Sequence, residues 1–407
     1  MDLTALQTKI NNYITVVSSW VRNIGAIYFD SVPADVTVQL IDEDGNVVDS
    51  TIPNRAKILS DMSNTIFDKL DVDKPIFEKV TAYSIKILLG FRVRVGENTI
   101  QTVSDFTLDL NVNLDTGLKT SGTDYYVFAL SDGGFIISAS KLNPDGFTST
   151  NSKLIGGFHY GLIPEDETPT GNKTTDDMTA INGINKYSFW DLKFRPISNP
   201  EGMVYIGGKW YDIYLLNSEH ITNGTSKANT IIAAGTTDYG RARPKIPLEY
   251  GGDGNIDYGS FKWIHTTEIA KAHSKELISY EEFMAIAYGV NEGKSSSTNG
   301  YEIVAGKVEH YSELTSKYGI EQATGVQYLW GKDLMNGYGT TSFAWKDNLE
   351  QRGQVYSTSN SPTAVLLGGD RDDGVNAGSR ASNWDYYVWS SGWGVGCRFA
   401  CDHMKLV

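Results

Sequence analysis

Strict alternation of apolar and polar side chains over residues 106–114 is the feature that most limits the fold. The alternating positions are Phe106, Thr107, Leu108, Asp109, Leu110, Asn111, Val112, Asn113 and Leu114. A period of two places successive side chains on opposite faces, so it predicts a half-buried β-strand. The chain also has 41 Gly and 23 Tyr but only 11 Pro, which suits a turn-rich, mostly β protein better than a helical bundle.

We expect a hairpin after this strand. Tyr125–Leu130 and Phe135–Ala139 flank the turn sequence Ser131-Asp-Gly-Gly134, whose glycines can supply the positive φ of a tight turn. Short strands separated by turns over residues 96–155 predict a small β-sandwich. We interpret it as a spacer, because nothing in it is typical of a catalytic or metal-binding pattern.

Residues 1–22 carry a heptad pattern, with apolar side chains three and four residues apart. These are Leu3, Leu6, Ile10, Tyr13, Val17 and Trp20. An isolated helix of this length is marginal in water, so its apolar stripe needs a partner. Two alternatives remain open: the helix packs on its own domain, or it joins copies of the chain in a short bundle. The second assigns residues 1–95 to oligomerisation and attachment.

Two further elements are predicted in the N-terminal region. Alternating residues 36–40 precede Asp42-Glu-Asp-Gly-Asn46, so we expect a hairpin over residues 33–52. The same turn resembles half of a calcium loop, but it lacks the glutamate that would complete the shell. Residues 54–70 have helical spacing.

The remaining residues, 156–407, predict a mixture of short strands, helices and long loops. We expect strands within 203–216 and a helix at 267–273. Ser279 and Glu282 have the spacing of a capping box, so a second helix begins there. The whole chain is thus predicted to be α+β and mostly β.

Charge and hydropathy exclude several classes of function. The chain has 35 Lys and Arg against 49 Asp and Glu, a net charge of −14. A binder of phosphate backbones needs clustered cations, so we expect no nucleic-acid partner. No apolar run reaches about 18 residues, so we expect no membrane insertion. The N-terminus does not resemble a signal peptide, which predicts a soluble protein made in the cytoplasm without Sec-type export.

The familiar catalytic motifs are absent from the sequence. Its six histidines are scattered, and none forms a His-Glu-x-x-His pair. There is no hydrolase elbow and no phosphate-binding glycine loop. We therefore predict no catalytic residues, no metal site and no cofactor.

The two cysteines, Cys397 and Cys401, are predicted to be free thiols. If residues 395–400 form a strand, positions four apart lie on one face but about 13 Å from each other. A disulfide requires Cα atoms within about 7 Å.

The loop-rich segment 367–396 carries the strongest functional signal. Its thirty residues include seven Gly, three Trp and the adjacent Tyr386 and Tyr387. Rigid aromatic residues among small polar ones are typical of antibody binding loops, and Trp, Tyr and Arg dominate interface hot spots. The alternative is that the tryptophans are core residues and the glycines merely turn the chain.

Several stretches resemble the C-type-lectin-like domain of phage major tropism determinant proteins, the variable proteins of diversity-generating retroelements. The matching stretches are Ser188–Pro196, Gly202–Tyr214, Ala270–Leu277, Glu281–Phe283 and Gly368–Asp402. This likeness implies a C-terminal lectin-like domain at 156–407 with a variable segment at 368–402. Residues 1–150 match the family only in plan, as an assembly region followed by a β-sandwich.

The resemblance also implies which residues face the receptor. In that family a retroelement rewrites adenines of a template, mostly in AAC or AAT codons, which yields residues such as Asp, Tyr, Ser and Gly but never Trp. The expected variable positions are Asp370, Arg371, Asp372, Asp373, Val375, Asn376, Asp385, Tyr386, Tyr387, Ser391, Gly392 and Gly394. Trp389 and Trp393 are expected to be fixed aromatic contacts, and Trp384 part of the frame.

Two rival functions share this fold. Formylglycine-generating enzymes carry a cysteine pair shortly after a Gly-Gly that corresponds to Gly368-Gly369, but Asp370–Ala377 contains no cysteine. Sugar-binding C-type lectins use Glu-Pro-Asn or Gln-Pro-Asp at their calcium, and neither tripeptide occurs.

The resemblance implies a receptor-binding protein at the tip of a phage tail fibre. Its expected partners are a bacterial surface receptor, protein or glycan, and other tail-fibre or baseplate proteins. The expected assembly is a homotrimer located in the virion. Two alternatives remain open: a sulfatase-modifying enzyme and a purely structural fibre component.

Overall fold

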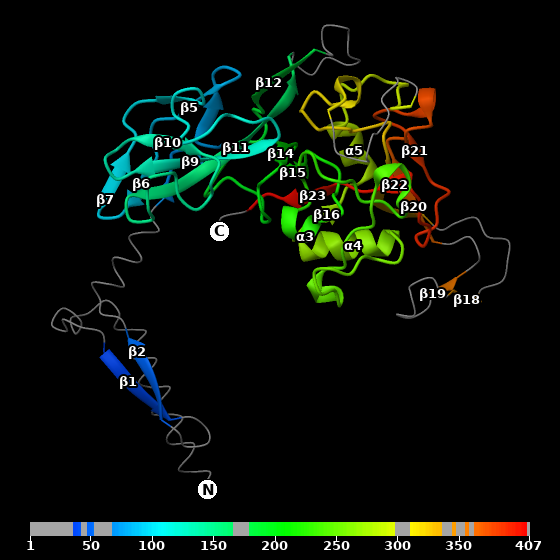
Figure 1. Cartoon of the computed structure of the whole chain (residues 1–407), viewed down its shortest axis with the longest axis horizontal. Coiled ribbons are helices and arrows are strands. Elements are labelled where there is room, and N and C mark those ends of the chain that lie inside the picture. Colours follow the sequence, from blue (N-terminus) through cyan, green and yellow to red (C-terminus); the bar gives the residue numbers. More distant parts are fainter. Residues whose placement is uncertain are drawn as a thin grey trace, which may run out of the picture. The chain divides into compact units, whose positions relative to one another are not determined.

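The computed structural model describes most of the chain. The described residues are 36–41, 47–52, 67–165, 179–297, 310–335, 344–346, 355–357 and 362–404. They fall in two compact units, Met1–Ile66 and Phe67–Val407 (Figure 1). The predicted heptad at 1–22 lies outside the described residues, as does most of the predicted helix at 54–70. Where the description resumes, Phe67–Asp68 form strand β3 instead of the end of that helix.

The first unit contains the predicted hairpin. Strands β1 (Val36–Ile41) and β2 (Val47–Ile52) pair in antiparallel fashion, with Ile41 opposite Val47. This confirms the strands of the hairpin, whereas the turn between them lies outside the described residues.

The second unit begins with β-strands that share one hydrophobic core, which we call the sandwich part (residues 67–191). Its strands are β3, β4 (Phe77–Lys79), β5 (Ser84–Ile87), β6 (Arg92–Val95), β7 (Asn98–Gln101), β8 (Phe106–Asp109), β9 (Thr123–Leu130), β10 (Phe135–Ser138), β11 (Ser152–Pro164), β12 (Ala180–Ile184) and β13 (Trp190–Asp191). They form antiparallel sheets of order β3-β6-β7, β4-β5-β8 and β10-β9-β11-β12, with β13 on β11. Alternating inward side chains of these sheets fill the core.

Two of the predictions made from the sequence concern strands of the sandwich part. The hairpin of β9 and β10 is confirmed, with Phe135 opposite Ala129. The strand predicted over 106–114 ends early, at Asp109. Its carboxylate accepts a hydrogen bond from the Asn111 N–H at 2.7 Å, and its carbonyl accepts one from Val112 at 3.0 Å. This Asx turn replaces the sheet ladder and ends the strand.

The sandwich part extends on both sides of the expected range 96–155. The boundary expected at 95 falls between β6 and β7, which pair through Val95 and Asn98. The boundary expected at 155 falls inside β11. Strands on either side of both points contribute to one buried core, so this chain segment cannot be divided there without exposing apolar surface.

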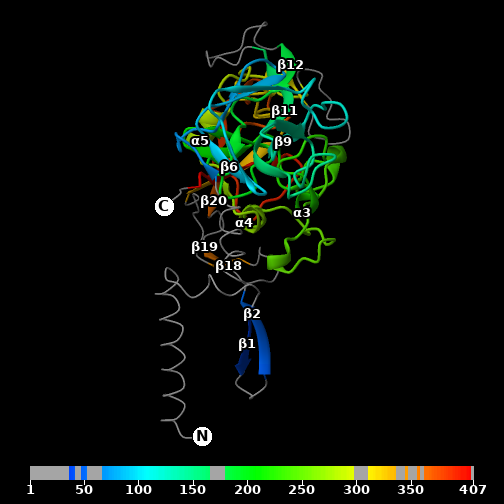
Figure 2. The ribbon, with the colours of Figure 1, turned by 90° about the vertical axis from the view of Figure 1, so that its left-hand side faces the viewer.

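The remaining described residues form the C-terminal part (residues 196–404). Its elements are β14 (Met203–Ile206), β15 (Lys209–Asp212), α3 (His220–Asn223), η2 (Asp238–Gly240), η3 (Leu248–Tyr250), α4 (Trp263–Ala272), β16 (Glu276–Leu277), α5 (Tyr280–Ile286), η5 (Ser312–Leu314), β17 (Tyr328–Met335), β18 (Ala344–Lys346), β19 (Val355–Ser357), β20 (Thr363–Leu367), η6 (Gly374–Asn376), β21 (Ser382–Asn383), β22 (Val395–Gly396) and β23 (Phe399–Asp402). Two four-stranded sheets have the orders β14-β15-β23-β16 and β21-β20-β17-β22, and β18 pairs with β19. Figure 2 views the same ribbon from the side.

The predicted helices of this part are present. Helix α5 begins after Ser279, whose hydroxyl accepts from the Glu282 N–H while the Glu282 carboxylate accepts from the Ser279 N–H. This is the predicted capping box. Helix α4 begins at Trp263, earlier than the predicted 267, because the His265 imidazole bonds to the Lys262 N–H and extends the first turn.

The predicted strand over 395–400 is interrupted at Cys397 and Arg398. The buried Arg398 guanidinium donates to the carbonyls of Ile213 and Glu321, so it ties together segments far apart in sequence. Each carbonyl is thereby satisfied away from water. Both cysteines are buried and free, as predicted from their spacing.

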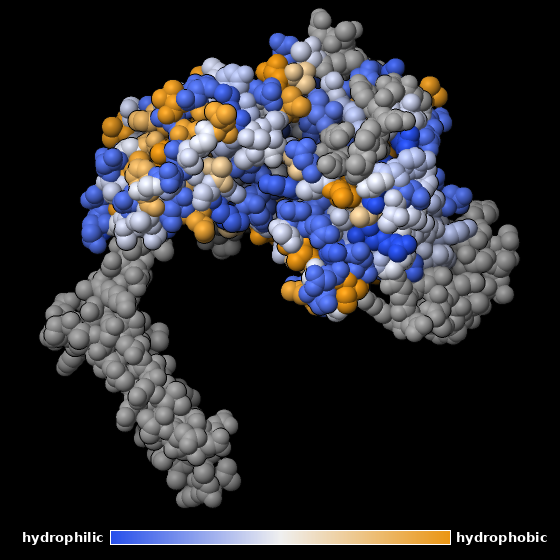
Figure 3. Space-filling view, in the orientation of Figure 1, coloured by the Kyte–Doolittle hydropathy of each residue, from blue (hydrophilic) through white to orange (hydrophobic). Residues whose placement is uncertain are grey.

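Several apolar side chains are exposed on the sandwich part. Figure 3 shows hydrophobic residues spread over its strands. Five of them are 78–89% exposed: Leu70, Val103, Val112, Leu118 and Leu142. Among the described residues, no helix is long and apolar enough to cross a membrane.

Candidate functional site

The predicted variable segment, 368–402, starts from a sharp turn after β20. Gly368 and Gly369 have φ of +90° and +80°, in the left-handed region that favours glycine. A Cβ on Gly369 would lie 2.8 Å from the Ala377 Cβ, so close packing adds a second requirement for glycine. The chain then passes through η6, β21 and an irregular loop before it returns to the core in β22 and β23.

Most of the predicted receptor-facing residues reach the surface. Asp372, Val375, Asn376 and Asp385 are exposed. The half-buried ones are Asp370, Arg371, Asp373, Tyr386, Tyr387, Trp389, Ser391, Gly392 and Trp393. The prediction that Gly394 faces the receptor is wrong, because this residue is buried.

Gly394 has a structural role instead. Its carbonyl accepts a hydrogen bond from the Tyr328 N–H at 2.9 Å, where the segment joins the sheet beside β17. A Cβ at this position would lie 2.6 Å from Oδ2 of Asp370, so a larger residue would displace the acidic turn.

The acidic turn, residues 370–373, is held by its own side chains. The Asp370 N–H donates to Oδ2 of Asp373 at 2.6 Å, and the Asp372 N–H donates to Oδ1 of Asp370 at 2.9 Å. Burial raises the pKa of Asp370 to about 6, and the neighbouring Asp373 carboxylate adds to the rise. No group of three or more His, Cys, Asp or Glu side chains in the described part of the chain is placed to hold a metal ion.

An aromatic–cation cluster joins the two ends of the variable loop. The Arg371 guanidinium lies 4.2 Å from the centre of the Tyr239 ring, and that ring lies 5.0 Å from Trp393. Behind them, the buried Arg241 donates to the carbonyls of Trp393 and Val326. Burial lowers the pKa of Arg241 to about 10, and repulsion from Arg371 contributes to this fall. Because the value is still well above 7, the guanidinium stays charged at neutral pH.

Tyr239 and Arg241 were missed by the sequence analysis. Both precede the predicted segment by more than a hundred positions, so no local pattern connects them to it. One feature of the sequence could have indicated them: Asp238-Tyr-Gly-Arg241 places an aromatic residue and an arginine beside a glycine, a composition typical of exposed loops.

A second aromatic pair lies farther along the loop. Tyr387 and Trp389 stack with their ring centres 5.5 Å apart and an angle of 21° between planes. Tyr386 packs against the buried Trp330, at 5.7 Å, and both Tyr386 and Trp389 pack against the same hydrophobic core, so these two residues serve the core as well as the surface. Trp384 packs on the core, in agreement with its expected place in the frame.

The frame holds this loop mostly through its main chain. The Gly235 N–H donates to the Gly392 carbonyl at 3.0 Å, and the Trp263 N–H donates to the Val388 carbonyl at 3.1 Å. Some contacts use side chains of the segment: the Phe261 N–H donates to the Ser391 hydroxyl at 2.9 Å, and the Ser379 hydroxyl donates to the Glu292 carboxylate. Because main-chain contacts do not depend on side-chain identity, front-facing side chains can change while the loop keeps its path.

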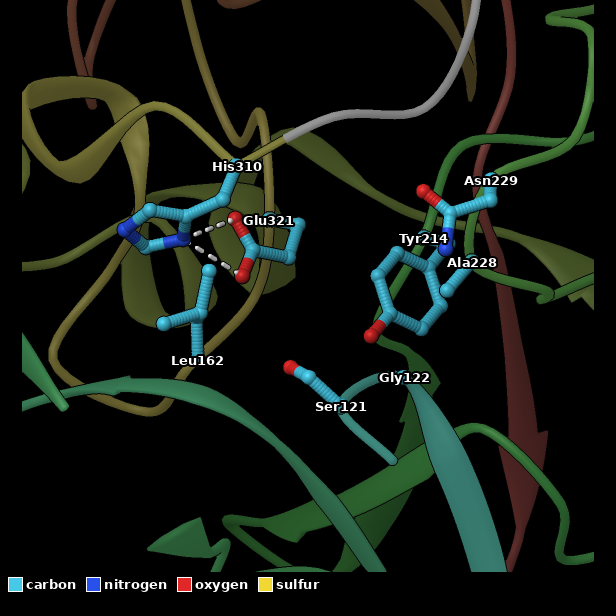
Figure 4. A pocket seen from close by; sticks show the side chains of 8 residues that line it. All are labelled: Ser121, Gly122, Leu162, Tyr214, Ala228, Asn229, His310 and Glu321. Atoms are coloured by element: carbon cyan, nitrogen blue, oxygen red, sulfur yellow. Dashed lines mark hydrogen bonds and ion pairs between the residues drawn. The ribbon is translucent and has the colours of Figure 1, made fainter. Parts of the chain in front are cut away.

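A second candidate site is a polar cavity of about 160 Å³ beside the sandwich part (Figure 4). It is lined by Ser121, Gly122, Leu162, Tyr214, Ala228, Asn229, His310 and Glu321. Next to it, the His159 ring bridges the Asp124 carboxylate, at 3.0 Å, and the Tyr214 hydroxyl, at 2.9 Å. This order of groups resembles an acid–base relay.

The relay is poorly suited to catalysis. Burial raises the pKa of Tyr214 far above its usual range, so its hydroxyl stays protonated and is a poor nucleophile. The His310 ring bonds both oxygens of Glu321, at 2.8 and 2.9 Å, and Thr315 donates to the same carboxylate. These groups therefore pair with one another across a junction between segments, although the buried Nε2 of His310 has no hydrogen-bond partner among the described residues.

The thiol chemistry of the rival enzyme class is also disfavoured. Cys397 is fully buried, and burial raises the pKa of its thiol well above its usual value, with a further rise from Asp212. A reactive cysteine needs an accessible thiolate, which this environment opposes.

Comparisons with known proteins agree with this geometry. The family model described as the Mtd second domain matches residues 75–191. A tail fiber receptor-binding protein of Bordetella phage BPP-1 is 34% identical over 352 residues, 85% of this chain and 87% of that protein. The I1 and U1 variants of Major Tropism Determinant have TM-scores of 0.74 and 0.73 at 32% identity, each match covering 90% of this chain and 95% of theirs. The C-terminal part thus has the C-type-lectin-like fold expected from the sequence, and the chain belongs to the Major Tropism Determinant family of phage tail-fibre receptor-binding proteins.

Proposed function

We propose that this protein recognises a bacterial surface receptor through the loop face of its C-terminal part. The face consists of the acidic turn at 370–373, the aromatic–cation cluster at Arg371 and Trp393, and the stacked pair Tyr387–Trp389. Partly exposed aromatics with mixed polar neighbours supply both contact area and adaptable hydrogen bonds. The observation that carries the proposal is that a loop held largely by main-chain hydrogen bonds brings these side chains fully or partly to the surface.

The same arrangement supports diversification of the face. Asp370, Asp372, Asp373 and Asp385 are residues that the adenine-directed codon changes of such retroelements can produce. Substitution at the exposed Asp372 and Asp385 removes few packing contacts, because neither is buried. Segment 368–402 is accordingly proposed as the variable segment of the chain.

We further propose that the protein acts as a homo-oligomer, with a trimer as the expected state, in the virion. Avidity supplies the physical reason, because linked copies convert later contacts into intramolecular ones and strengthen binding by about 10² to 10⁴. The N-terminal region, with its heptad pattern, is proposed for assembly and attachment to tail-fibre or baseplate proteins. Synthesis in the host cytoplasm and the absence of catalysis complete the proposal.

A labelling experiment tests the receptor-binding function. The purified full-length protein, carrying a fluorescent label, is titrated onto cells of candidate host strains and onto a phage-resistant derivative. Trp389→Ala and Trp393→Ala are compared with Tyr250→Ala, an aromatic truncation in η3 outside the loop face. Loss of labelling by the first two variants, with folding retained, supports the function; unchanged labelling by both contradicts it.

A further inference from the structure

One exposed side chain outside the predicted variable segment lies within the recognition face. Loop 235–241 packs directly behind and beside residues 391–393: a Cβ on Gly235 would lie 2.1 Å from the Ser391 Oγ and 2.6 Å from the Gly392 nitrogen. Residues 237–240 of this loop are exposed. The loop therefore shares a continuous surface with the variable segment.

Tyr239 occupies that loop in an unfavourable backbone conformation. Its φ and ψ are 56° and 32°, in the left-handed region, where a bulky residue is uncommon. The next residue, Gly240, also has a positive φ, +72°. There the chain uses a glycine, whereas position 239 has a tyrosine. Strain of this kind gathers at functional sites, where the side chain has a use that offsets it.

The side chain of Tyr239 is only partly covered by its neighbours. It is 46% exposed, although its ring contacts Arg371 on one side and Trp393 on the other. A partly exposed tyrosine flanked by an arginine and a tryptophan has the composition of an interface hot spot. Its neighbours come from the segment expected to vary, whereas Tyr239 itself lies outside it.

We infer that Tyr239 is a fixed receptor-contact residue, a constant aromatic anchor around which the variable side chains are exchanged. This inference rests on the proposed receptor-binding function and adds a specificity-determining residue to it. A rigid tyrosine ring loses little conformational entropy on binding, so it offers baseline affinity to many versions of the neighbouring loop.

The test uses substitution to glycine. Tyr239→Gly removes the ring and also relieves the left-handed strain, so the melting temperature of the full-length protein should stay within a few degrees of the wild type. Labelling of a strain that the wild type labels should weaken by roughly tenfold or more, as for a hot-spot truncation. Tyr239→Phe should retain most of the labelling, and Tyr250→Ala should retain all of it.

Two outcomes overturn the inference. Wild-type labelling by Tyr239→Gly means that the ring makes no contact, and a large fall in melting temperature means that it is a structural support. An Arg371→Ala background separates contact from positioning, because Tyr239→Gly should weaken labelling further there only if the ring itself meets the receptor. If Trp389→Ala and Trp393→Ala label normally, the proposed function fails whatever Tyr239 does.

Discussion

A pair of histidines, His220 buried and His273 half-buried, makes the stability of the C-terminal part depend on pH. Nδ1 of His220 lies 2.9 Å from Nε2 of His273, and the other His220 nitrogen donates to the Lys245 carbonyl at 2.8 Å. Since His220 uses Nε2 as a donor, its Nδ1 accepts a hydrogen bond from the Nε2–H of His273, and this contact requires the His220 ring to be neutral. Protonation of His220 at Nδ1 would place two N–H donors face to face, whereas a charge on His273 is opposed by burial and by the nearby His220 and Lys275.

The magnitude follows from the pKa of His273. Burial lowers it from 6.5 to about 4, with further lowering by His220 and Lys275. Burial also lowers the pKa of His220, while Glu219 and the Lys245 carbonyl oppose that change. A lowered pKa means that the native state binds fewer protons than the unfolded chain. The stability from His273 is therefore complete above pH 6.5 and is lost as pH falls toward 4, about 2 kcal/mol of it between pH 7 and pH 5.

Urea denaturation of the full-length protein at pH 7 and pH 5 measures this loss. His273→Gln keeps an N–H donor for His220 but cannot titrate in this range. The free energy of unfolding should fall by about 2 kcal/mol more in the wild type than in the variant over this interval. Equal pH dependence of the two proteins would refute the lowered pKa of His273 in the native state.

Two further substitutions test the frame. Gly235→Ala should displace the main chain at Ser391 and Gly392 and destabilise the protein by about 1–3 kcal/mol, which thermal unfolding measures; an unchanged melting temperature would show that the two loops are not in close contact. Lys275→Met should lower the free energy of unfolding by about 3–5 kcal/mol, because it leaves the buried Asp212 carboxylate without its cation. Lys275→Met combined with Asp212→Leu should recover much of that loss. Equal losses for the single and double variants in chemical denaturation would contradict the ion pair.

Local sequence patterns predicted elements whose causes are local. The Ser279–Glu282 capping box and the hairpin of β9 and β10 follow from side chains a few residues apart, and both are present. The alternation over 106–114 predicted too long a strand, because the competing turn at Asp109 depends on a side-chain hydrogen bond that periodicity does not register.

Long-range features could not be predicted in this way. Arg398 donates hydrogen bonds to carbonyls almost 80 and 190 residues away in the sequence. Arg241 donates to the carbonyl of Trp393, which is 152 residues away. The segment 368–402 itself was found through composition and family resemblance. Its neighbour Tyr239 was not, because only the fold brings loop 235–241 to the same surface.

The central claim is that exposed and partly exposed side chains of one loop perform recognition, while hydrogen bonds largely to its main chain keep the path of the loop. The most direct measurement replaces Asp372, Asp385, Tyr387, Trp389 and Trp393 together by alanine and records both melting temperature and cell labelling. The account predicts a folded protein, with a melting temperature within several degrees of the wild type, that no longer labels the host strain. A folded variant that still labels those cells with wild-type affinity would contradict it.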